Sequence, residues 1–316
     1  MVARAELIDD GGRAASGPDF FRCPEFIGAE GATHSLVIQS GSARLQAPLI
    51  VRDVPGSATG LDAISPYGYP GFGIGDEASG LPIPVDEIDF SDTGLISIFI
   101  RHTLDGTPPL TGPTPRNVCL LADPALPPKS RMSDRQQVRK NEKRGYTVEF
   151  LPGPEVSGRE LEGFHRAYTE TMERTGAAGH YFFSREWFER ILGSEATWLA
   201  LARDGEGEVA AGSIAARSDG MLHYYLSGTD EAHLRDSPMK NVLTAMCEFA
   251  GERGMALNLG GGISPGDRLE EFKRGFTNRE EQWFTQEIVC DPVAYRELST
   301  GVDAEGFFPA YRAPSA

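Results

Sequence analysis

Long hydrophobic runs are missing from this sequence of 316 residues. A membrane-spanning helix needs roughly 18 consecutive apolar residues, and no stretch approaches that length. The N-terminal sequence MVARAELIDDGG is too polar and acidic for a secretory signal. We therefore expect a soluble, cytoplasmic protein that has no membrane partner.

Metal-binding patterns are also missing. The four cysteines, Cys23, Cys119, Cys247 and Cys290, form no Cys-x-x-Cys pair, and the six histidines form no HxxxH or HExxH pattern. These absences exclude the usual zinc hydrolases, and we predict no metal site. We interpret the cysteines as reduced, mostly buried hydrophobic side chains.

Lysine is scarce, and the chain as a whole is acidic. It has 30 basic and 46 acidic residues, a net charge of −16 and a pI near 4.8. Only five basic residues are lysines: Lys129, Lys140, Lys143, Lys240 and Lys273. An acidic protein of this kind is not a general nucleic-acid binder, and each lysine is a rarer event than usual.

One segment is basic, in contrast to the acidic chain as a whole. Residues 129–144 contain seven basic and two acidic residues. Ser133-x-x-Gln136 is a capping-box pattern and Gly145 is a typical residue after a helix end, so a helix is expected between them. A solvated basic helix is the ordinary interpretation. In so acidic a chain, a local contact with a polyanion is the alternative.

Composition indicates a globular protein of two domains, with 40% hydrophobic and 24% charged residues. Residues 65–75, SPYGYPGFGIG, are rich in turn formers and aromatics. Such a loop either only reverses the chain direction or lines a pocket. On the second interpretation, Tyr67 and Tyr69 are candidate substrate-binding residues.

The second half of the chain mixes helices and strands. Helices are expected at 157–175, 184–192 and 238–253, and strands at 197–203, 208–217 and 221–227, the last three forming a meander. A short strand at 256–259, three glycines, a short helix at 269–273 and a strand at 282–289 follow. This order is typical of an α+β domain.

Two motifs then indicate a family. Leu-Asn-Leu-Gly-Gly-Gly at 257–262 precedes Phe-Lys-Arg-Gly-Phe at 272–276, and Val138 begins the segment VRKNEKRGYTVE. Both motifs resemble the Fem family of aminoacyl-tRNA-dependent aminoacyltransferases in the GNAT superfamily. The resemblance implies an α+β fold of two tandem GNAT-like domains, each a mixed or antiparallel sheet flanked by helices. The implied division is an N-terminal domain at 1–128, a basic linker helix at 129–145 and a C-terminal domain at 146–316.

The resemblance also bears on the donor. Acetyl-CoA users in the superfamily carry a (Q/R)xxGx(G/A) loop whose N–H groups hold pyrophosphate at a helix N-terminus. The corresponding position here, residues 227–240, reads SGTDEAHLRDSPMK. The missing loop favours aminoacyl-tRNA as co-substrate, with no cofactor.

The acceptor differs from that of peptidoglycan-building members. Those begin with a Gln-Ser-x-x-Trp element and a nearby lysine that holds a nucleotide diphosphate, whereas this chain has no lysine before Lys129. A coiled-coil arm is also missing. The chain is similar to short members that aminoacylate small peptides or metabolites in antibiotic pathways. Three alternatives stay open: a peptidoglycan precursor held by arginines, an acyl-CoA-dependent N-acyltransferase, and a binding module without turnover.

The resemblance assigns roles to individual residues. Lys273 would stabilise the negative charge of the tetrahedral intermediate, and Phe272 would shape the aminoacyl pocket. The implied substrate-binding residues, with Tyr67 and Tyr69, are Arg174, Tyr181, Tyr224 and Gly261. The implied contacts with tRNA phosphates are Arg131, Arg135, Arg139, Lys140, Lys143 and Arg144. Core packing is the alternative for Phe272 and Tyr224, and a surface position is the alternative for Lys273.

Overall fold

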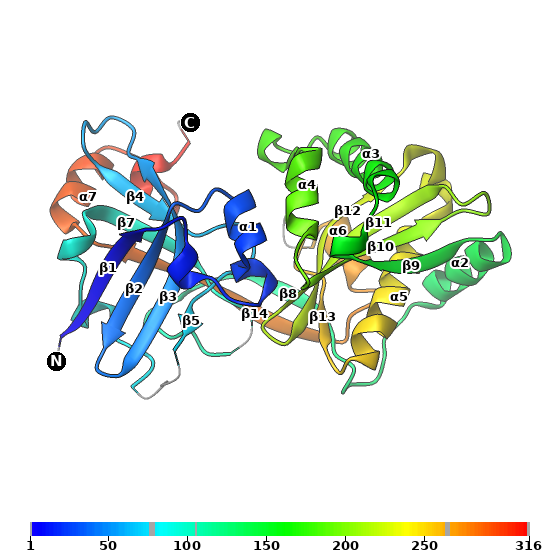
Figure 1. Cartoon of the computed structure of the whole chain (residues 1–316), viewed down its shortest axis with the longest axis horizontal. Coiled ribbons are helices and arrows are strands. Elements are labelled where there is room, and N and C mark those ends of the chain that lie inside the picture. The colour runs from blue at the N-terminus through cyan, green and yellow to red at the C-terminus, as the bar shows by residue number, and fades with distance from the viewer. Residues whose placement is uncertain (1, 76–79, 105, 263–265, 315–316) are drawn as a thin grey trace. The chain divides into compact units, whose positions relative to one another are not determined.

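The computed structural model describes residues 2–75, 80–104, 106–262 and 266–314, and the chain divides into two units (Figure 1). Unit 1 comprises residues 1–116 and 282–316, and unit 2 comprises residues 117–281. This division differs from the predicted one in two respects. The basic helix belongs to unit 2 and is not a linker, and the chain returns to unit 1 from Gln282 onward because strand β14 pairs there with β7.

Unit 1 is built on a mixed sheet in the strand order β6-β1-β2-β3-β4-β7-β14, with β5 also paired to β3. Its elements are β1 (Ala3–Asp9), α1 (Pro24–Ala29), β2 (His34–Ser40), β3 (Ala43–Asp53), β4 (Leu61–Ile64), β5 (Gly73–Ile74), β6 (Ile88–Asp89), β7 (Leu95–Arg101), β14 (Arg279–Val289) and α7 (Pro292–Ser299). Ile98 and Ile100 on β7 and Ile288 on β14 point into the hydrophobic core of this unit. Their alternation leaves the intervening side chains on the opposite face of the sheet.

The strands of unit 2 pair in the order β8-β13-β12-β11-β10-β9, with parallel and antiparallel neighbours. Its elements are β8 (Thr114–Ala122), α2 (Met132–Lys143), β9 (Thr147–Pro152), α3 (Gly158–Thr175), α4 (Arg185–Leu192), β10 (Thr197–Arg203), β11 (Val209–Ser218), β12 (Met221–Thr229), α5 (Met239–Glu252), β13 (Ala256–Asn258) and α6 (Arg268–Lys273). The predicted α+β class and the meander of β10, β11 and β12 are confirmed.

Helices cover both faces of the unit 2 sheet. Figure 1 shows α3 and α4 on one side and α5 on the other, and α2 contacts α5. Alanines at alternate positions of β10 and β11, among them Ala200, Ala202 and Ala211, let α5 approach the sheet closely, so that Val242 and Met246 pack into a core cluster.

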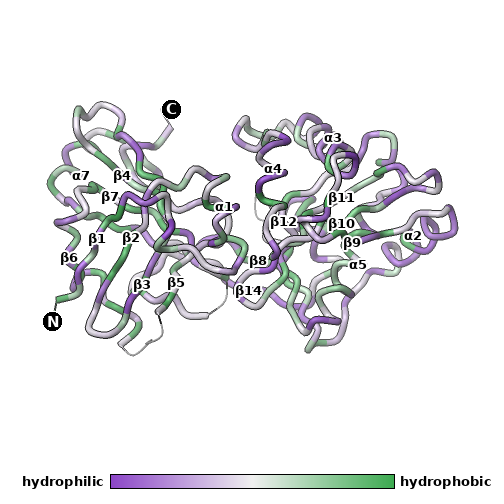
Figure 2. The backbone as a smooth tube through the Cα atoms, viewed as in Figure 1, coloured by the Kyte–Doolittle hydropathy of each residue, from purple (hydrophilic) through white to green (hydrophobic). Residues whose placement is uncertain are grey.

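Helix α2 begins earlier than predicted, so the prediction that Ser133 caps its N-terminus is wrong. The helix starts at Met132, with Arg131 as its N-cap and no side-chain cap. Its buried face decides its position: Asp134 pairs with Lys240 at 2.9 Å, and the Asn141 amide donates to the side-chain oxygen of Asn241 at 2.7 Å. The rest of α2 is hydrophilic, as Figure 2 shows.

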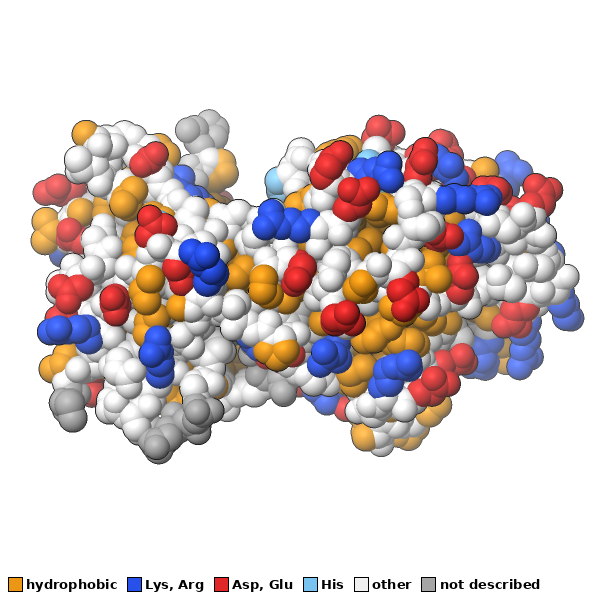
Figure 3. Space-filling model, in the orientation of Figure 1, with side chains coloured by type: hydrophobic (Ala, Val, Ile, Leu, Met, Phe, Trp, Pro, Cys, Tyr) orange, Lys and Arg blue, Asp and Glu red, His pale blue; other side chains and the backbone are white. Residues whose placement is uncertain are grey.

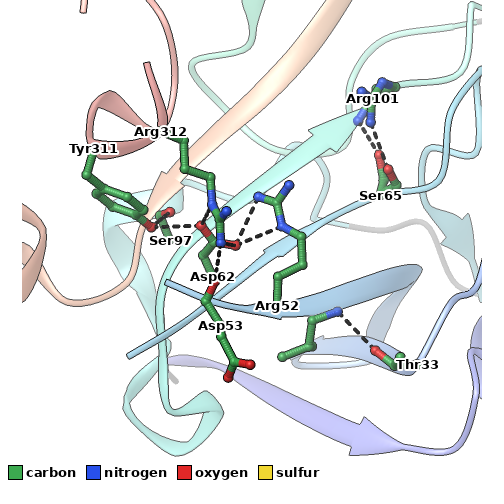
Figure 4. A network of polar contacts seen from close by, with 10 residues as sticks. Thr33, Arg52, Asp53, Asp62, Ser65, Ser97, Arg101, Tyr311 and Arg312 are labelled. Atoms are coloured by element: carbon green, nitrogen blue, oxygen red, sulfur yellow. Dashed lines mark hydrogen bonds and ion pairs between the residues drawn. The ribbon is translucent and has the colours of Figure 1, made fainter. Parts of the chain in front are cut away.

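The end of the chain is attached to the unit 1 sheet by a buried carboxylate (Figure 4). Asp62 on β4 has a side chain that is 1% exposed, and it pairs with Arg52 of β3 and with Arg312. The hydroxyl of Tyr311 donates to Asp62 at 3.2 Å and lies 2.7 Å from the hydroxyl of Ser97. These bonds hold the segment that follows α7 against the sheet.

Within the described ranges, no helix is long and apolar enough to cross a membrane. In the same ranges, no three His, Cys, Asp or Glu side chains are grouped so that they could hold a metal ion. The four cysteines are free; Cys23 and Cys119 are buried, and Cys247 and Cys290 are partly buried. The burial of Cys23 and Cys119 agrees with the interpretation as hydrophobic side chains, and the reduced state stays a prediction.

Candidate active site

The candidate active site of unit 2 lies at Gly260, Gly261 and Gly262, which follow β13. These glycines lie against the C-terminal end of α6. The Nζ of Lys273 donates to the carbonyl oxygen of Gly261 at 2.7 Å. Lys273 is only 8% exposed, which is uncommon for a lysine. A surface position for Lys273, the alternative left by the sequence, is therefore not observed.

Close approach explains why this strand end is made of glycine. A Cβ on Gly261 would lie 2.9 Å from the carbonyl oxygen of Val118 on β8, and a Cβ on Gly262 would lie 2.6 Å from a carboxylate oxygen of Asp267. Gly260 has a φ of +67°, a conformation that favours glycine. The strand end therefore reaches β8 and α6 at distances that a larger residue would prevent.

Burial changes the acidity of the lysine. It lowers the pKa of Lys273 to about 8, and the nearby Cys119 and Asp267 oppose this shift only in part. Near neutral pH the amine carries its proton in most molecules, and it loses that proton as the pH rises through about 8. An ammonium group in such a place can stabilise a developing oxyanion.

Asp267 and Cys119 are site residues that the sequence analysis missed. Asp267 is the N-cap of α6, and its carboxylate accepts the N–H of Glu270 at 2.7 Å. The pattern Asp267-x-x-Glu270 is a capping signature that could have identified the start of this helix. Cys119 lies on β8, far away in the sequence, and no local pattern links it to Lys273.

The parallel pairing of β12 and β13 ends close to this site. It runs from Met221 to His223, whereas β12 continues to Thr229. A β-bulge opposite Ser213 and Ile214 places Leu226 at a φ of +51°, and bulges of this kind bend a strand. The pairing of the two parallel strands therefore stops at His223 and Asn258, just before the glycines.

Tyr224 lies on β12 directly after the last residue paired with β13. Its hydroxyl is 2.5 Å from the hydroxyl of Ser227, and burial raises the pKa of Tyr224 to about 12. The side chain packs against the hydrophobic cluster formed with α5, whereas Tyr225 points to the other face of the sheet. A role for Tyr224 in substrate binding stays a prediction.

The other predicted substrate residues are spread over the two units. Phe272 is half-buried and makes an edge contact with Phe276, so it neighbours Lys273 in the chain and joins the core. Arg174 is exposed in the last turn of α3. The hydroxyl of Tyr168 donates to the backbone carbonyl oxygen of Tyr181 at 2.6 Å. The structure thus brings Phe272, Lys273 and Gly261 together.

Tyr67 and Tyr69 belong to unit 1. The Tyr67 side chain is 41% exposed, and its ring lies 5.8 Å from the guanidinium carbon of Arg101. The Tyr69 ring makes edge contacts with Phe21 and Trp283. The loop is therefore shaped by aromatic packing, and its contact with a substrate stays a prediction.

The basic helix is exposed and joins the candidate site at one point. All six predicted tRNA contacts have exposed side chains: Arg131, Arg135, Arg139, Lys140, Lys143 and Arg144. The guanidinium of Arg131 donates to the carbonyl oxygen of Glu271 on α6 at 2.9 Å. Arg144 pairs with Asp236. Blue side chains lie along the α2 end of unit 2 in Figure 3.

The region where a coenzyme A user would hold pyrophosphate has other contacts. Residues 231–236 form a short 3-10 helix, and the side-chain amides of Gln137 and Asn141 donate to the carbonyl oxygen of Asp236 at 3.1 and 2.8 Å. At the start of α5, the N–H groups of Lys240 and Asn241 already donate to backbone carbonyls. Few N–H groups are left there for a pyrophosphate.

The arrangement matches a known domain. A family model described as the acetyltransferase (GNAT) domain matches residues 128–274, which is most of unit 2. Most of unit 2 is therefore similar in sequence to a GNAT domain. No curated protein matches the sequence of this chain significantly.

The whole chain has a Fem-like fold. It superposes on the crystal structure of FemX with a TM-score of 0.64 and 13% sequence identity, covering 92% of this chain and 99% of FemX. It also superposes on L-PGS from Bacillus licheniformis, with a TM-score of 0.55, 13% identity and coverage of 90% and 93%. A third match is the C-terminal domain of a putative lysylphosphatidylglycerol synthetase from Agrobacterium fabrum, with a TM-score of 0.54, 14% identity and coverage of 88% and 89%.

These matches confirm the predicted fold class of tandem GNAT-like domains and the resemblance to the Fem family. At such low sequence identity they show a shared fold. Together, the GNAT domain and the fold support an acyltransferase.

Proposed function

We propose that this protein transfers an amino acid from an aminoacyl-tRNA to the amine of a small peptide or metabolite, in the biosynthesis of an antibiotic or another specialised metabolite. The placement of Lys273 carries the proposal. A buried amine with a lowered pKa lies at a glycine strand end, on a helix that also contacts Arg131 at the start of the basic segment.

The reaction needs little chemistry from the protein, because the ester of an aminoacyl-tRNA is already activated. The neutral amine of the acceptor attacks the ester carbonyl, and the Lys273 ammonium stabilises the oxyanion that forms. The attacking amine loses one proton as the amide bond forms, and the departing ribose oxygen gains one proton as the ester bond breaks. Positioning of the two substrates supplies the rest of the rate enhancement, with no cofactor.

Phe272 shapes the aminoacyl pocket in this proposal, beside the Gly261 carbonyl that orients Lys273. The acceptor is bound by Arg174, Tyr181 and Tyr224 in unit 2. Tyr67 and Tyr69 of unit 1 stay predicted substrate-binding residues.

Two observations support tRNA over coenzyme A as the carrier of the acyl group. The exposed basic side chains of α2 form a surface suited to phosphates, and Arg131 links it to α6. In addition, the N-terminal end of α5 is tied to α2 through Asn141 and Asn241, where a pyrophosphate would need free N–H groups.

The experiment that tests the proposal is transfer of radiolabelled amino acids from total charged bacterial tRNA into small amine-bearing acceptors. The assay is run with and without RNase, and with acetyl-CoA in parallel. We expect RNase-sensitive transfer that identifies the amino acid. Transfer from acetyl-CoA alone, unaffected by RNase, would instead identify an acyl-CoA-dependent enzyme, and no transfer from either donor would indicate a binding module.

Reversing two charges on α2 tests the tRNA surface. In the double variant Arg139→Glu and Lys143→Glu, we expect tRNA binding to weaken about tenfold or more at moderate salt. The dependence of log K on log salt should also become shallower by roughly 1 for each lost phosphate contact. Filter binding of a single purified tRNA over a salt series measures both quantities.

The matched control reverses two exposed arginines on the other side of the unit 2 sheet, Arg159 on α3 and Arg190 on α4. It changes the net charge of the protein by the same amount. Equal weakening in both double variants would mean that only the overall charge matters and would remove α2 as the tRNA contact.

The pH dependence of the rate tests the charge state of Lys273. Its pKa is lowered to about 8 by burial, so the charged form is lost as the pH rises through 8. If the ammonium is the active form, the rate of the wild-type protein relative to Lys273→Arg should fall about fivefold between pH 8 and 9, because arginine stays charged. A ratio that rises with pH would instead make the neutral amine the active form.

A further inference from the structure

A chain of buried hydrogen bonds in unit 2 leads from β11 to the carbonyl that holds Lys273. Its members are Ser218 at the end of β11, His223 on β12, Asn258 on β13 and the glycines that follow β13. Ser218, His223 and Asn258 are each at most 3% exposed. Asparagine and serine are seldom buried so deeply, and the chemistry proposed for Lys273 has not yet used these side chains.

The direction of each bond in this chain follows from the groups at its two ends. The backbone N–H of Gly260 can only donate, so the atom of Asn258 that lies 2.8 Å from it is the amide oxygen. The amide nitrogen therefore faces Nδ1 of His223, at 3.1 Å, and donates to it. Nε2 of His223 then carries the ring proton and donates to the carbonyl oxygen of Ser218 at 3.4 Å. Every donor thus meets an acceptor when His223 is in this one neutral tautomer.

Asn258 fixes the first glycine after β13. The bond from the Gly260 N–H to the Asn258 side chain closes an Asx turn, in which the side chain takes the place of a backbone acceptor. The carbonyl oxygen of Gly260 in turn accepts the N–H of Leu120 on β8 at 3.1 Å. Both polar groups of Gly260 are therefore bonded. The end of β13 is held to β12 through Asn258 and His223, and to β8 through the backbone (Figure 1).

The next residue, Gly261, presents the carbonyl oxygen to which Nζ of Lys273 donates at 2.7 Å. Three consecutive glycines have more backbone conformations open to them than any other tripeptide. Without the two bonds of Gly260, the direction of the Gly261 carbonyl would vary, and the ammonium of Lys273 would lose its fixed acceptor. The segment therefore needs a clamp, and the amide of Asn258 supplies the side-chain part of it.

We propose that Asn258 is a positioning residue: together with His223 it orients the glycines at 260–262 so that the Gly261 carbonyl holds the Lys273 ammonium where the oxyanion forms. This inference rests on the proposed function, because the oxyanion belongs to the transfer reaction. Asn258 is buried, so it acts through Gly261 and not by contact with a substrate. A displacement of about 1 Å can cost about 100-fold in rate, so the effect on kcat can be large.

The scarcity of lysine allows the position of Lys273 to be measured without a transfer assay. Protein labelled with ¹⁵N at the lysine Nζ atoms has only five ammonium groups, and a buried, hydrogen-bonded ammonium exchanges its protons with water more slowly than an exposed one. NMR at roughly pH 6 observes Lys273 in its charged form. Lys240, which pairs with Asp134 at 2.9 Å, is the internal control for the fold of unit 2. The variants Lys273→Arg and Lys240→Arg assign the two signals.

Two variants of Asn258 separate positioning from packing. Asn258→Ala removes both bonds of the amide, so we expect the Lys273 signal to be lost while the Lys240 signal stays. The kcat of transfer should fall about tenfold or more, and the KM for the acceptor should change less than about threefold. Asn258→Asp keeps an acceptor for the Gly260 N–H and should retain the signal and most of the rate. Thr197→Val, the matched control, removes a buried hydrogen bond elsewhere in unit 2 and should change neither.

His223→Leu is the second variant should Asn258→Ala fail to fold. It leaves the Asx turn and removes the partner of the amide nitrogen, so the Lys273 signal should weaken. The proposal is overturned if a folded variant of either residue keeps both the Lys273 signal and kcat, if the signals of Lys273 and Lys240 are lost together, or if the wild-type spectrum shows Lys240 without Lys273. A Lys273 signal that depends on Asn258 in a protein without any transfer would instead contradict the proposed function alone.

Discussion

Replacing Lys273 by alanine is expected to lower the rate of aminoacyl transfer about 100- to 1,000-fold, the usual effect of removing one donor to a developing oxyanion. The structure gives the physical reason. The Nζ is buried beside the Gly261 carbonyl, and water cannot easily take the place of an ammonium in a site of low exposure. Single-turnover rates at saturating acceptor measure the effect on the chemical step, and the loss should appear in kcat more than in KM.

Two control variants make this result interpretable. Lys273→Met keeps the length of the side chain and removes the charge, so it separates loss of charge from loss of packing. Arg268→Gln changes an exposed residue on the same short helix and should leave the rate unchanged. If Lys273→Met folds and retains most of the wild-type rate, Lys273 has no part in the chemistry.

Replacing Asp62 by alanine should cause the largest loss of stability. The variant leaves the Arg52 and Arg312 guanidinium groups without the buried carboxylate that both contact. Breaking a buried pair costs about 3–5 kcal/mol, and the partial exposure of both arginines places this case near the lower limit. For a unit of this size, a loss of about 3 kcal/mol corresponds to a fall in Tm of roughly 6–12 °C by calorimetry.

The matched comparison is an exposed ion pair in the same unit. Arg4 and Asp92 are 3.9 Å apart, with side chains 72% and 62% exposed. Asp92→Ala should therefore change the free energy of unfolding by less than about 1 kcal/mol. Equal effects of Asp62→Ala and Asp92→Ala would show that the buried network does not attach the end of the chain.

The sequence predicted the bounds of an element best where the local residue pattern itself stabilises that element. Strand β10 was predicted with its observed bounds, Thr197–Arg203, because alternating small apolar residues end at the turn that follows Arg203. Helix α3 ended as predicted, since Gly176 follows it in the left-handed conformation. The start of α2 failed because burial of Asp134 and Asn141 against α5 outweighed the capping pattern of Ser133.

The sequence likewise identified some residues of the candidate site and missed others. The motif Phe272-Lys273 and the glycines at 260–262 could be read from the chain, because a close approach demands glycine wherever it occurs. Asp267 gave a weak capping signal, and Cys119 gave none. The cavity of unit 1 lined by Phe99, Arg116 and Phe307 could not be predicted, because these residues come from β7, β8 and the segment after α7, which no local pattern connects.

The sequence by itself determined the α+β class, most helix and strand positions, the basic segment and the residues around Lys273, because propensity, periodicity and glycine requirements act over a few residues. Only the tertiary structure decided that the chain from Gln282 onward returns to unit 1, and that burial lowers the pKa of Lys273. It alone also decided that Asp62 holds the C-terminal segment. Strand pairing and burial depend on residues far apart in the chain, and their energies are set by the packed fold.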